Sequence, residues 1–334
     1  MSFKLLTSHL NTNEDIFTDD EYIFKISKKG ISKKILAERS YYEFISYIAK
    51  RYSRFYPVYL GYEVVSGKNL IKLEYLKNYK TLSYLLLNER ITSIQCEKIV
   101  QDVVSILAKF SLLKQKGSGV NFFEKLYTNR VFERMLIMEE NSFYRKLNNS
   151  KCIVINKKKY SNIRSTFENF ISNKSYIEIL IDGQSPSFFH GDLHFENILI
   201  NSNLNIKFVD PNGRISGLLS YDVGKILHSL IGKYDLIQNY KYTIKILNNN
   251  MFYFSVGRNL QIEALQKIYL GKLGSTFETK FVMQSYFACW CHMISLIPHH
   301  LNNRGNQALA FYFQTLEVGQ IFLDKFNKYI KFSY

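Results

Sequence analysis

Residues 188–200 read FFHGDLHFENILI, and this stretch decides how the rest of the chain is interpreted. It places a polar and charged loop between two apolar runs. His190 and His194 stand four positions apart, as on a zinc-protease helix, whereas Asp192 and Asn197 stand five apart, as in a phosphoryl-transfer loop. The two interpretations predict different chemistry and different local structure.

The zinc interpretation requires a helix. In an H-E-x-x-H site the helix points both imidazoles to one side, and the glutamate polarises a water molecule. Gly191, which is unfavourable in a helix interior, stands where that glutamate would be. The flanking residues are typical of strands. We therefore expect no zinc site at His190 and His194.

The phosphoryl-transfer interpretation requires a base beside the attacking hydroxyl and oxygen ligands for Mg²⁺. Asp192 can orient the hydroxyl and accept its proton, and Asn197 offers an amide oxygen. The next residues read as apolar strand, turn and apolar strand, which predicts a β-hairpin that ends at Asp210. Such a hairpin returns Asp210 to Asn197, where the pair can hold one or two Mg²⁺ ions. Each residue alone is an ordinary turn or cap residue, but their joint arrangement favours this interpretation.

HGDLHFEN followed by FVDPNG resembles the aminoglycoside phosphotransferase and choline kinase superfamily, which has a protein-kinase-like fold. Its motif is H-G-D-x-x-x-x-N, followed by a hydrophobic strand that ends in D. SYDVGKILHSL, residues 220–230, resembles the next helix of this family, and Asp222 matches an aspartate that supports the catalytic loop. The resemblance implies that Asp192 is the catalytic base and that Asn197 and Asp210 bind Mg²⁺.

The histidines have supporting roles in this interpretation. We expect the His190 ring to form a hydrogen bond with the backbone near Asp210. His194 is expected to pack within the loop, and Glu196 is expected to face solvent. The implied cofactors are Mg²⁺ and a purine nucleoside triphosphate, ATP or GTP.

A kinase also needs a cation on the phosphates and a carboxylate that holds this cation. Lys25 lies in the middle of the strand-like EYIFKIS, residues 21–27, opposite its apolar neighbours. It therefore faces either a cleft or water, and the downstream motif favours a phosphate-binding lysine. On the following helix, Glu38 matches the glutamate of the family better than Glu43 does, so we predict that Glu38 holds Lys25.

The nucleotide base is expected at LIKLEYLKNYKTL, residues 70–82, which resembles the hinge strand of the family. There the backbone groups of Glu74, Tyr75 and Leu76 would meet the adenine edge. Backbone contacts of this kind depend little on the side chains, so they follow from the resemblance alone.

The first turn, TSHLNTNED, departs from the glycine-rich loop of many kinases because it contains no glycine. Choline-kinase-like members tolerate T-N in this region, to which Thr12 and Asn13 would correspond. The side chains of Ser8 or Asn13 are the alternative candidates to contact the phosphates. The missing glycines leave a nucleotide-binding pseudokinase or sensor as an alternative. The intact Asp192, Asn197 and Asp210 favour an enzyme.

The pattern of elements predicts an α+β fold, and the resemblance implies a protein-kinase-like bilobal one. Residues 1–78, with strands and a helix over 33–52, form the expected small antiparallel-sheet, nucleotide-binding lobe. Residues 79–334 form the expected larger, mainly helical lobe for catalysis and acceptor binding. Helices of this lobe are expected over residues 91–117, 122–147 and 160–173 and from beyond Tyr221 to the end, with breaks near Gly232, Gly271 to Gly274, and Pro298.

A small-molecule hydroxyl is the expected acceptor, because Asp210 and Asp222 are only twelve positions apart and leave no room for a long activation segment. Arg214 and Lys225 are candidates to contact an anionic acceptor. Further acceptor-binding candidates are Tyr286, Trp290, His299, His300 and Arg304. For the aromatic residues Tyr286 and Trp290, core packing is the stronger interpretation.

A sugar, or an amino alcohol such as choline or ethanolamine, is the predicted acceptor. An aminoglycoside is less expected, since a pocket for this cationic ligand is typically acidic and the chain has a formal charge of +16. That charge suits an anionic ligand or surface. However, the lysines stand in short runs such as Lys157 to Lys159, as on solvated faces, and no nucleic-acid motif accompanies them.

Composition sets the remaining expectations. At 46% hydrophobic and 22% charged residues, the chain can bury a sizeable core. Its four cysteines form no zinc or disulfide pattern, which fits a reducing cytoplasm. The N-terminal MSFKLLTSHL lacks the apolar core of a signal peptide, and no run approaches the roughly 20 apolar residues of a membrane span. We expect a cytoplasmic protein and make no prediction of its oligomeric state.

Overall fold

The computed structural model describes residues 4–7, 14–302 and 306–333. These residues fall into two compact units. The first unit takes residues from 1–91 and 188–217, and the second takes those from 92–187 and 218–334. The first is rich in strands and the second in helices, so the predicted α+β class is confirmed.

The main sheet of the first unit is five-stranded and antiparallel, as predicted, with the strand order β1-β2-β3-β5-β4. Lys25 lies on β3 opposite Ile16 on one side and Ile71 on the other. Its side chain and that of Ser27 are buried, so this face of β3 points into the unit. The strands are β1 (Lys4–Thr7), β2 (Glu14–Thr18), β3 (Tyr22–Ser27), β4 (Tyr59–Val65) and β5 (Lys68–Glu74).

Helix α1 (Lys33–Glu43) begins at Ser32, whose hydroxyl accepts a hydrogen bond from an amide of the first turn as an N-cap. The helix predicted over residues 33–52 does not continue as one α-helix. It widens into a π-helical turn (Phe44–Ile48) and then tightens into a 3₁₀ helix (Lys50–Phe55). The buried face of α1 is formed by Ile35, Glu38, Tyr41 and Tyr42.

A second sheet of the first unit has the order β11-β10-β6. In this sheet β10 pairs with β6, with Leu199 opposite Thr81, so it joins residues of the segment 188–217 to residues 79–81 within the first unit. The elements are β6 (Tyr79–Thr81), α2 (Leu82–Asn88), the 3₁₀ helix Phe195–Asn197, β10 (Ile198–Asn201), β11 (Ile206–Phe208) and the short strands β9 (Ser187–Phe188) and β12 (Ser216–Gly217).

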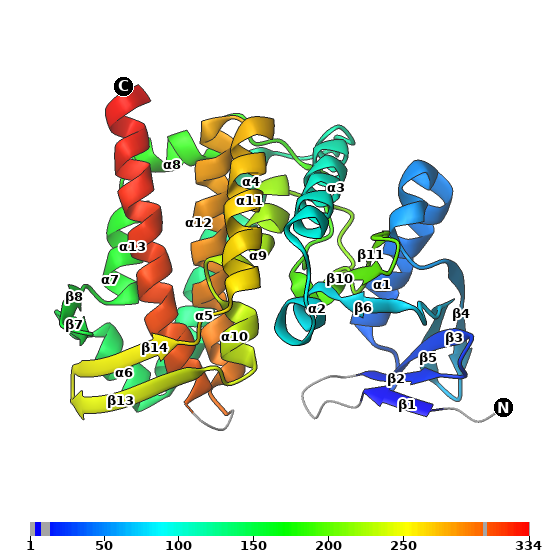
Figure 1. Ribbon diagram of the computed structural model, residues 1–334, viewed down its shortest axis with the longest axis horizontal. Coiled ribbons are helices and arrows are strands. Elements are labelled where there is room, and N and C mark those ends of the chain that lie inside the picture. The colour runs from blue at the N-terminus through cyan, green and yellow to red at the C-terminus, as the bar shows by residue number, and fades with distance from the viewer. Residues whose placement is uncertain (1–3, 8–13, 303–305, 334) are drawn as a thin grey trace. The chain divides into compact units, whose positions relative to one another are not determined.

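Helix α12 forms the centre of the second unit. All residues from Met283 to Ser295 are buried, and α12 packs against α9 and α13, as Figure 1 shows. A helix that is apolar on all sides is typical of such a central position. The helices are α3 (Ser93–Ser111), α4 (Gly119–Phe123), α5 (Asn129–Glu140), α6 (Ser142–Asn148), α7 (Ile163–Ile171), α8 (Lys174–Ile181), α9 (Leu219–Leu230), α10 (Tyr234–Gln238), α11 (Leu260–Thr276), α12 (Thr279–Leu296) and α13 (Gln307–Ser333).

Three helix predictions need correction. The helix predicted to reach residue 117 ends at Ser111. The helix predicted over 122–147 is divided into α4, a π-helical turn (Glu124–Thr128), α5 and α6, and the Asn141 side chain caps α6. The break predicted near Gly271 to Gly274 comes a few residues later, because α11 continues to Thr276 and α12 begins at Thr279. A single helical glycine is tolerated at about 1 kcal/mol.

The predictions of helix ends near Gly232 and Pro298 are confirmed. Helix α9 ends at Leu230. Helix α12 ends at Leu296 and is followed by a 3₁₀ helix (Ile297–His300).

The second unit also contains a four-stranded sheet, so the prediction that the chain is helical beyond Tyr221 was wrong. Residues 242–256 read YTIKILNNNMFYFSV, a β-like pattern around an asparagine turn. Phe252 and Phe254 anchor this hairpin, with ring centroids 4.7 and 5.5 Å from that of Phe313. In the order β13-β14-β7-β8, the strands are β13 (Tyr242–Asn248), β14 (Met251–Val256), β7 (Ile153–Ile155) and β8 (Lys158–Tyr160).

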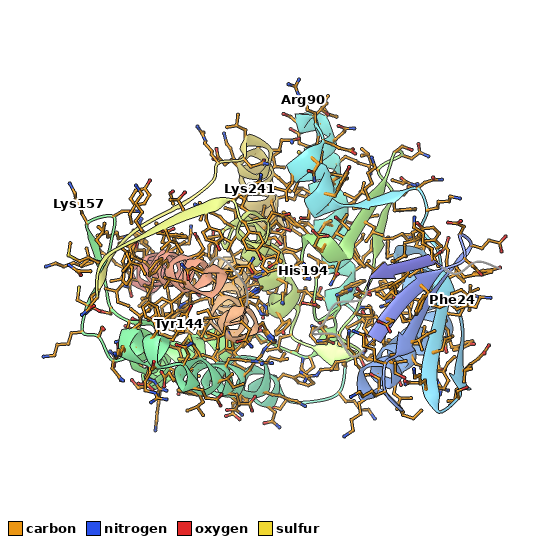
Figure 2. The ribbon with its side chains drawn as sticks, turned by 90° about the horizontal axis from the view of Figure 1, so that it is seen from below. Phe24, Arg90, Tyr144, Lys157, His194 and Lys241 are labelled. Atoms are coloured by element: carbon orange, nitrogen blue, oxygen red, sulfur yellow. The ribbon has the colours of Figure 1, made fainter. Side chains whose placement is uncertain are left out.

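The lysine run at residues 157–159 and the cysteines are as the sequence predicts. Lys157, Lys158 and Lys159 are exposed, and the Lys157 side chain projects outward in Figure 2. All four cysteines are free thiols, and Cys289 and Cys291 are buried. Over the described ranges, no helix combines the length and apolar character needed to cross a membrane.

Candidate functional site

The predicted hairpin consists of β10 and β11. Ile198 lies opposite Phe208, and the amide of Val209 donates to the carbonyl of Asn197 at 3.1 Å. This last bond extends the antiparallel ladder beyond β11. Asp210 therefore follows the residue that is bonded to Asn197, as the prediction required.

The loop before the hairpin is held by His190, which is fully buried. The amide of Asp192 donates to Nδ1 of His190 at 3.2 Å, so Nε2 carries the proton and donates to the carbonyl of Val209 at 2.9 Å. Burial, against the attraction of Asp192, lowers the pKa of His190 to about 4, so the ring is neutral at pH 7. The predicted hydrogen bond from His190 to the backbone beside Asp210 is present.

In this loop the side chain of Asn197 is buried, whereas those of Asp192 and Glu196 reach solvent. The side-chain amide of Asn197 donates to the carbonyl of Asp192 at 2.8 Å, which fixes the amide orientation. The carboxylate of Asp192 is 38% exposed and lies 3.8 Å from Nε2 of His194. Glu196 faces solvent, as predicted.

The turn after β11 contains Asn212 and Gly213, whose contacts the sequence does not predict. The amide of Asn212 donates to the carbonyl of His190, and its side chain donates to that of Gly191, both at 3.1 Å. Gly191 has φ +81, and a Cβ there would lie 2.0 Å from the Asn212 side chain. Gly213 has φ +80, and a Cβ there would lie 2.5 Å from Ala37 on α1. The D-P-N-G sequence signals a turn, but not these contacts.

Lys25 lies between two carboxylates. Its ammonium group forms ion pairs with Glu38 on α1 and with Asp210 after β11. Glu43, the rejected alternative, pairs with Arg39 instead. The Lys25 and Glu38 side chains are 6% and 1% exposed, whereas Asp210 is 48% exposed.

The charges of this cluster are interdependent. Burial opposes the charge of Lys25, but Asp210 and Glu38 outweigh it and raise the Lys25 pKa well above its usual value. Loss of water around Asp210 opposes its charge too, yet Lys25 lowers its pKa. For Glu38, burial outweighs the attraction of Lys25 and raises the pKa. Lys25 and Asp210 are therefore both charged at pH 7.

A pocket of about 230 Å³ adjoins this cluster in the first unit, and both Lys25 and Asp210 line it. Pockets that enclose a whole drug-sized ligand typically measure about 300–1,000 Å³, so this one suits a planar base. Its apolar walls are formed by Ile16, Ile23, Leu73, Leu199 and Val209.

The predicted hinge residues also line this pocket. The amide of Glu74 donates to the carbonyl of Val58, and its carboxylate accepts from the Val58 amide. The Leu76 carbonyl accepts from the Tyr79 amide, whereas the Leu76 N–H donates to no residue that the structure describes. Leu76 thus offers a backbone donor beside an apolar slot.

The oxygen groups of the loop fit a magnesium ion. Asn197 directs its NH₂ to a carbonyl, so the amide oxygen is the atom that can meet a cation. Asp210 adds a partly exposed carboxylate. In the described ranges, no group of three or more His, Cys, Asp or Glu side chains is placed to hold a metal. Mg²⁺ typically binds one or two carboxylates and completes its coordination with water and substrate phosphates, so this donor set is compatible with it.

Several remaining predicted site residues lie either outside the described ranges or in the second unit. Those that lie outside the described residues are Ser8, Thr12, Asn13 and Arg304. Asp222 is fully buried in the first turn of α9 in the second unit, and its support of the loop stays a prediction. Tyr286 and Trp290 are buried in α12, so core packing is confirmed for them.

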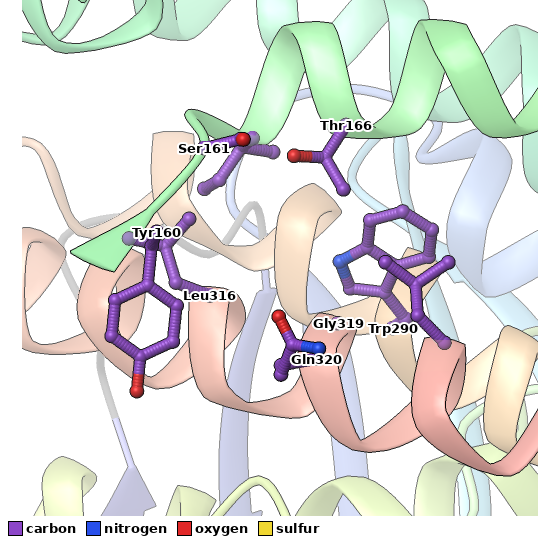
Figure 3. A pocket seen from close by; sticks show the side chains of 9 residues that line it. Tyr160, Ser161, Thr166, Trp290, Leu316, Gly319 and Gln320 are labelled. Atoms are coloured by element: carbon purple, nitrogen blue, oxygen red, sulfur yellow. The ribbon is translucent and has the colours of Figure 1, made fainter. Parts of the chain in front are cut away.

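A small pocket of about 110 Å³ adjoins Trp290 in the second unit (Figure 3). Ser161, Thr166 and Gln320 are among its polar lining residues. None of its nine lining residues is charged, and only Tyr160 and Trp290 are aromatic. This pocket therefore contains neither a charged anchor nor an aromatic cage for a charged acceptor.

No family model matches the chain, and no curated protein matches its sequence. Solved structures similar to it include choline kinase LicA from Streptococcus pneumoniae, at 10% identity and a TM-score of 0.48 over 96% of this chain and 94% of that one. LicA in complex with AMP matches at 11% identity and 0.48 over 96% and 92%. Plasmodium vivax ethanolamine kinase matches at 11% and 0.47 over 97% and 83%. Because these TM-scores are below 0.5, the function has to be inferred from the chain's own residues.

Proposed function

We propose that this chain is a Mg²⁺-dependent phosphotransferase with a protein-kinase-like fold. It would transfer the γ-phosphate of ATP or GTP to a hydroxyl group of a small molecule. The buried Lys25, held between Glu38 and Asp210 beside an apolar pocket, is the observation that carries this proposal.

A buried lysine with two carboxylates is expensive to desolvate, so its position calls for an explanation. Phosphoryl transfer gives one, since it needs a cation on the nucleotide phosphates and a carboxylate that positions this cation. Glu38 supplies the carboxylate. Asp210, which is half-exposed, is the partner that Lys25 can exchange for a phosphate group.

The loop residues have complementary roles in this proposal. Asp192 orients the acceptor hydroxyl and takes its proton, for which a partly exposed carboxylate is suited. Asn197 and Asp210 would hold Mg²⁺, which supplies charge neutralisation of the phosphates when it is bound. Neutral His190 holds the backbone of Asp192 and Val209 together, so it fixes the base relative to the metal ligands.

The base of the nucleotide would occupy the 230 Å³ pocket. The backbone N–H of Leu76 and the carbonyl of Glu74 would meet its edge. Asp222 would support the loop, and the second unit would bind the acceptor, a sugar or an amino alcohol.

Nucleotide binding is tested first, by thermal shift of the full chain with Mg-ATP and Mg-GTP. Stabilisation by at least one of them, abolished by EDTA, is expected. If neither nucleotide shifts the melting temperature, the phosphotransferase proposal is wrong.

Turnover is tested next with choline, ethanolamine, hexoses and aminoglycosides. In Asp192→Asn we expect the nucleotide-induced shift to persist while kcat falls by about 10²- to 10⁴-fold. Glu196→Gln, a solvent-facing neighbour in the same loop, is the matched control and should retain activity. Nucleotide binding without turnover in the wild type, unchanged in Asp192→Asn, would instead indicate a sensor.

A further inference from the structure

Helix α5 presents two arginines on one face. Arg130 and Arg134 are four positions apart, so they lie on successive turns of the helix. The guanidinium of Arg130 donates to the hydroxyl of Tyr221 on α9, and it lies 5.6 Å from the centre of that ring. Arg134 forms no ion pair or hydrogen bond with another described residue. This face of α5 is therefore positively charged.

Helix α9 adds a third cation. Tyr221 and Lys225 are also four positions apart and share one face of α9. Because Arg130 is bonded to Tyr221, the face that bears Lys225 is turned toward the arginines of α5. Lys225 is half-buried on a helix whose other residues are buried. Arg130, Arg134 and Lys225 are hereafter called the cationic cluster.

The 3₁₀ helix Ile297–His300 packs against α5 and brings His299 to the same region. His299 keeps part of its surface exposed. Loss of water around its ring and then the charges of Arg134, Arg130 and Lys225 lower its pKa to about 4. The imidazole is therefore neutral at pH 7, and the three cations disfavour its protonation.

Positive charge from three elements favours an anionic ligand and disfavours a cationic one. The planar guanidinium of arginine matches phosphate and carboxylate oxygens with two parallel hydrogen bonds. A quaternary ammonium or a protonated amine would meet repulsion here. The cluster thus discriminates among the acceptors that the proposed function leaves open.

We propose that the cationic cluster binds an anionic group of the acceptor, so that the substrate is a small hydroxyl compound that also bears a phosphate or a carboxylate. This inference rests on the proposed function. It selects phosphorylated sugars or hydroxy acids over choline, ethanolamine and neutral hexoses. The basic overall composition of the chain is consistent with such a substrate.

Matched pairs of acceptors test the proposal by turnover. The pairs are glucose with glucose 6-phosphate, glycerol with glycerol 3-phosphate, and ethanolamine with serine. The anionic member of at least one pair should have a kcat/KM at least about tenfold higher, and the pair in which this occurs separates phosphate from carboxylate. Preference for the neutral or cationic member of every pair that is turned over would overturn the inference.

Arginine variants locate the anion. Arg134→Ala should raise the KM for the anionic acceptor by about 10- to 100-fold and leave the KM for Mg-nucleotide unchanged. Arg134→Lys, which keeps the charge but loses the planar fork, should be intermediate. Arg258→Ala is the control, since Arg258 pairs with Glu263 in the same unit. Equal effects of Arg134→Ala and Arg258→Ala would contradict the assignment.

Calorimetry with inorganic phosphate, without nucleotide, gives a readout independent of catalysis. Binding should weaken in Arg134→Ala and persist in Arg258→Ala. If phosphate does not bind, or binds equally to Arg134→Ala, the anion site is wrong even if Mg-ATP stabilises the protein. Conversely, Arg134-dependent phosphate binding without any nucleotide-induced shift would overturn the phosphotransferase proposal and retain the anion site.

Discussion

The two units arrange their charged side chains in opposite ways. In the first unit, Lys25 is enclosed by the carboxylates of Glu38 and Asp210. In the second unit, Arg130, Arg134 and Lys225 bring charges of one sign together around a neutral His299. The first arrangement pairs opposite charges within the protein, whereas the second is proposed to bind an anion.

This difference separates what stabilises the fold from what selects a ligand. A buried charge needs its partners, so removal of one partner leaves another charge uncompensated. Charges of the same sign that are partly solvated repel one another, so removal of one relieves repulsion. The predictions below test this contrast, from the largest expected effect to the smallest.

The largest effect is expected for Lys25→Met. It leaves Glu38 buried without its cation and should lower the free energy of unfolding by about 3–5 kcal/mol. Chemical denaturation measures it, and the double variant Lys25→Met/Glu38→Gln should recover part of the loss. Lys28→Met is the control, because Lys28 and Asp15 form a partly exposed pair expected to contribute less than about 1 kcal/mol. Equal losses for both lysines would contradict the contrast.

A glycine pair should give effects of opposite sign in the two units. Gly191→Ala places a Cβ against Asn212 at a positive φ and should cost about 1–3 kcal/mol. Gly271→Ala adds a Cβ in α11 that meets nothing within 4 Å and should stabilise by up to about 1 kcal/mol. Thermal unfolding of both variants measures the difference. A Gly191→Ala protein as stable as the wild type would show that the loop before the hairpin is not constrained by Asn212.

Arg134→Ala should change the free energy of unfolding by less than about 0.5 kcal/mol, since it removes no ion pair among the described residues. Its effect should instead be on binding. Inorganic phosphate should raise the melting temperature of the wild type and not that of Arg134→Ala. A large loss of stability without phosphate would mean that Arg134 acts structurally.

The smallest effect is a shift of the His299 pKa. Loss of water around the ring is the main cause of the low pKa, and neighbouring cations lower it further. Arg134→Ala should therefore raise the pKa part of the way from about 4 toward 6.5, as measured by NMR titration of the imidazole. Because the folded-state pKa lies below the usual 6.5, His299 reduces stability as the pH falls from about 6.5 toward 4. Arg134→Ala should narrow the pH range over which protonation of His299 reduces stability. An unchanged pKa would place Arg134 too far away to share a ligand.

The placement of the candidate site residues in the first unit was largely predictable from the sequence. Asp192, Asn197 and Asp210 lie on one loop and its hairpin, where strand periodicity determines which residues return to each other. Lys25 was selected from strand alternation together with the downstream motif. Glu38 was selected because it matches the glutamate of the resembled family, and the ion pair between the two agrees with that prediction.

Only the tertiary structure revealed the contacts between distant segments. Asn212 and Gly213 read as turn residues, and their contacts with Gly191 and Ala37 depend on how the turn packs. The sequence does not predict the β13–β14 hairpin, because an apolar run between helices is typical of another helix. Its strand state depends on pairing with β7 and on packing against α13.

The cationic cluster likewise could not be predicted from the sequence. Arg130 and Lys225 are far apart in the sequence, and nothing in their local spacing connects them. The sequence alone was enough to predict that the loop 190–197 leads into a hairpin that returns Asp210 to Asn197, because short-range geometry fixes those residues. The tertiary structure decided which charges share a surface, because only helix packing brings α5, α9 and the turn at His299 together.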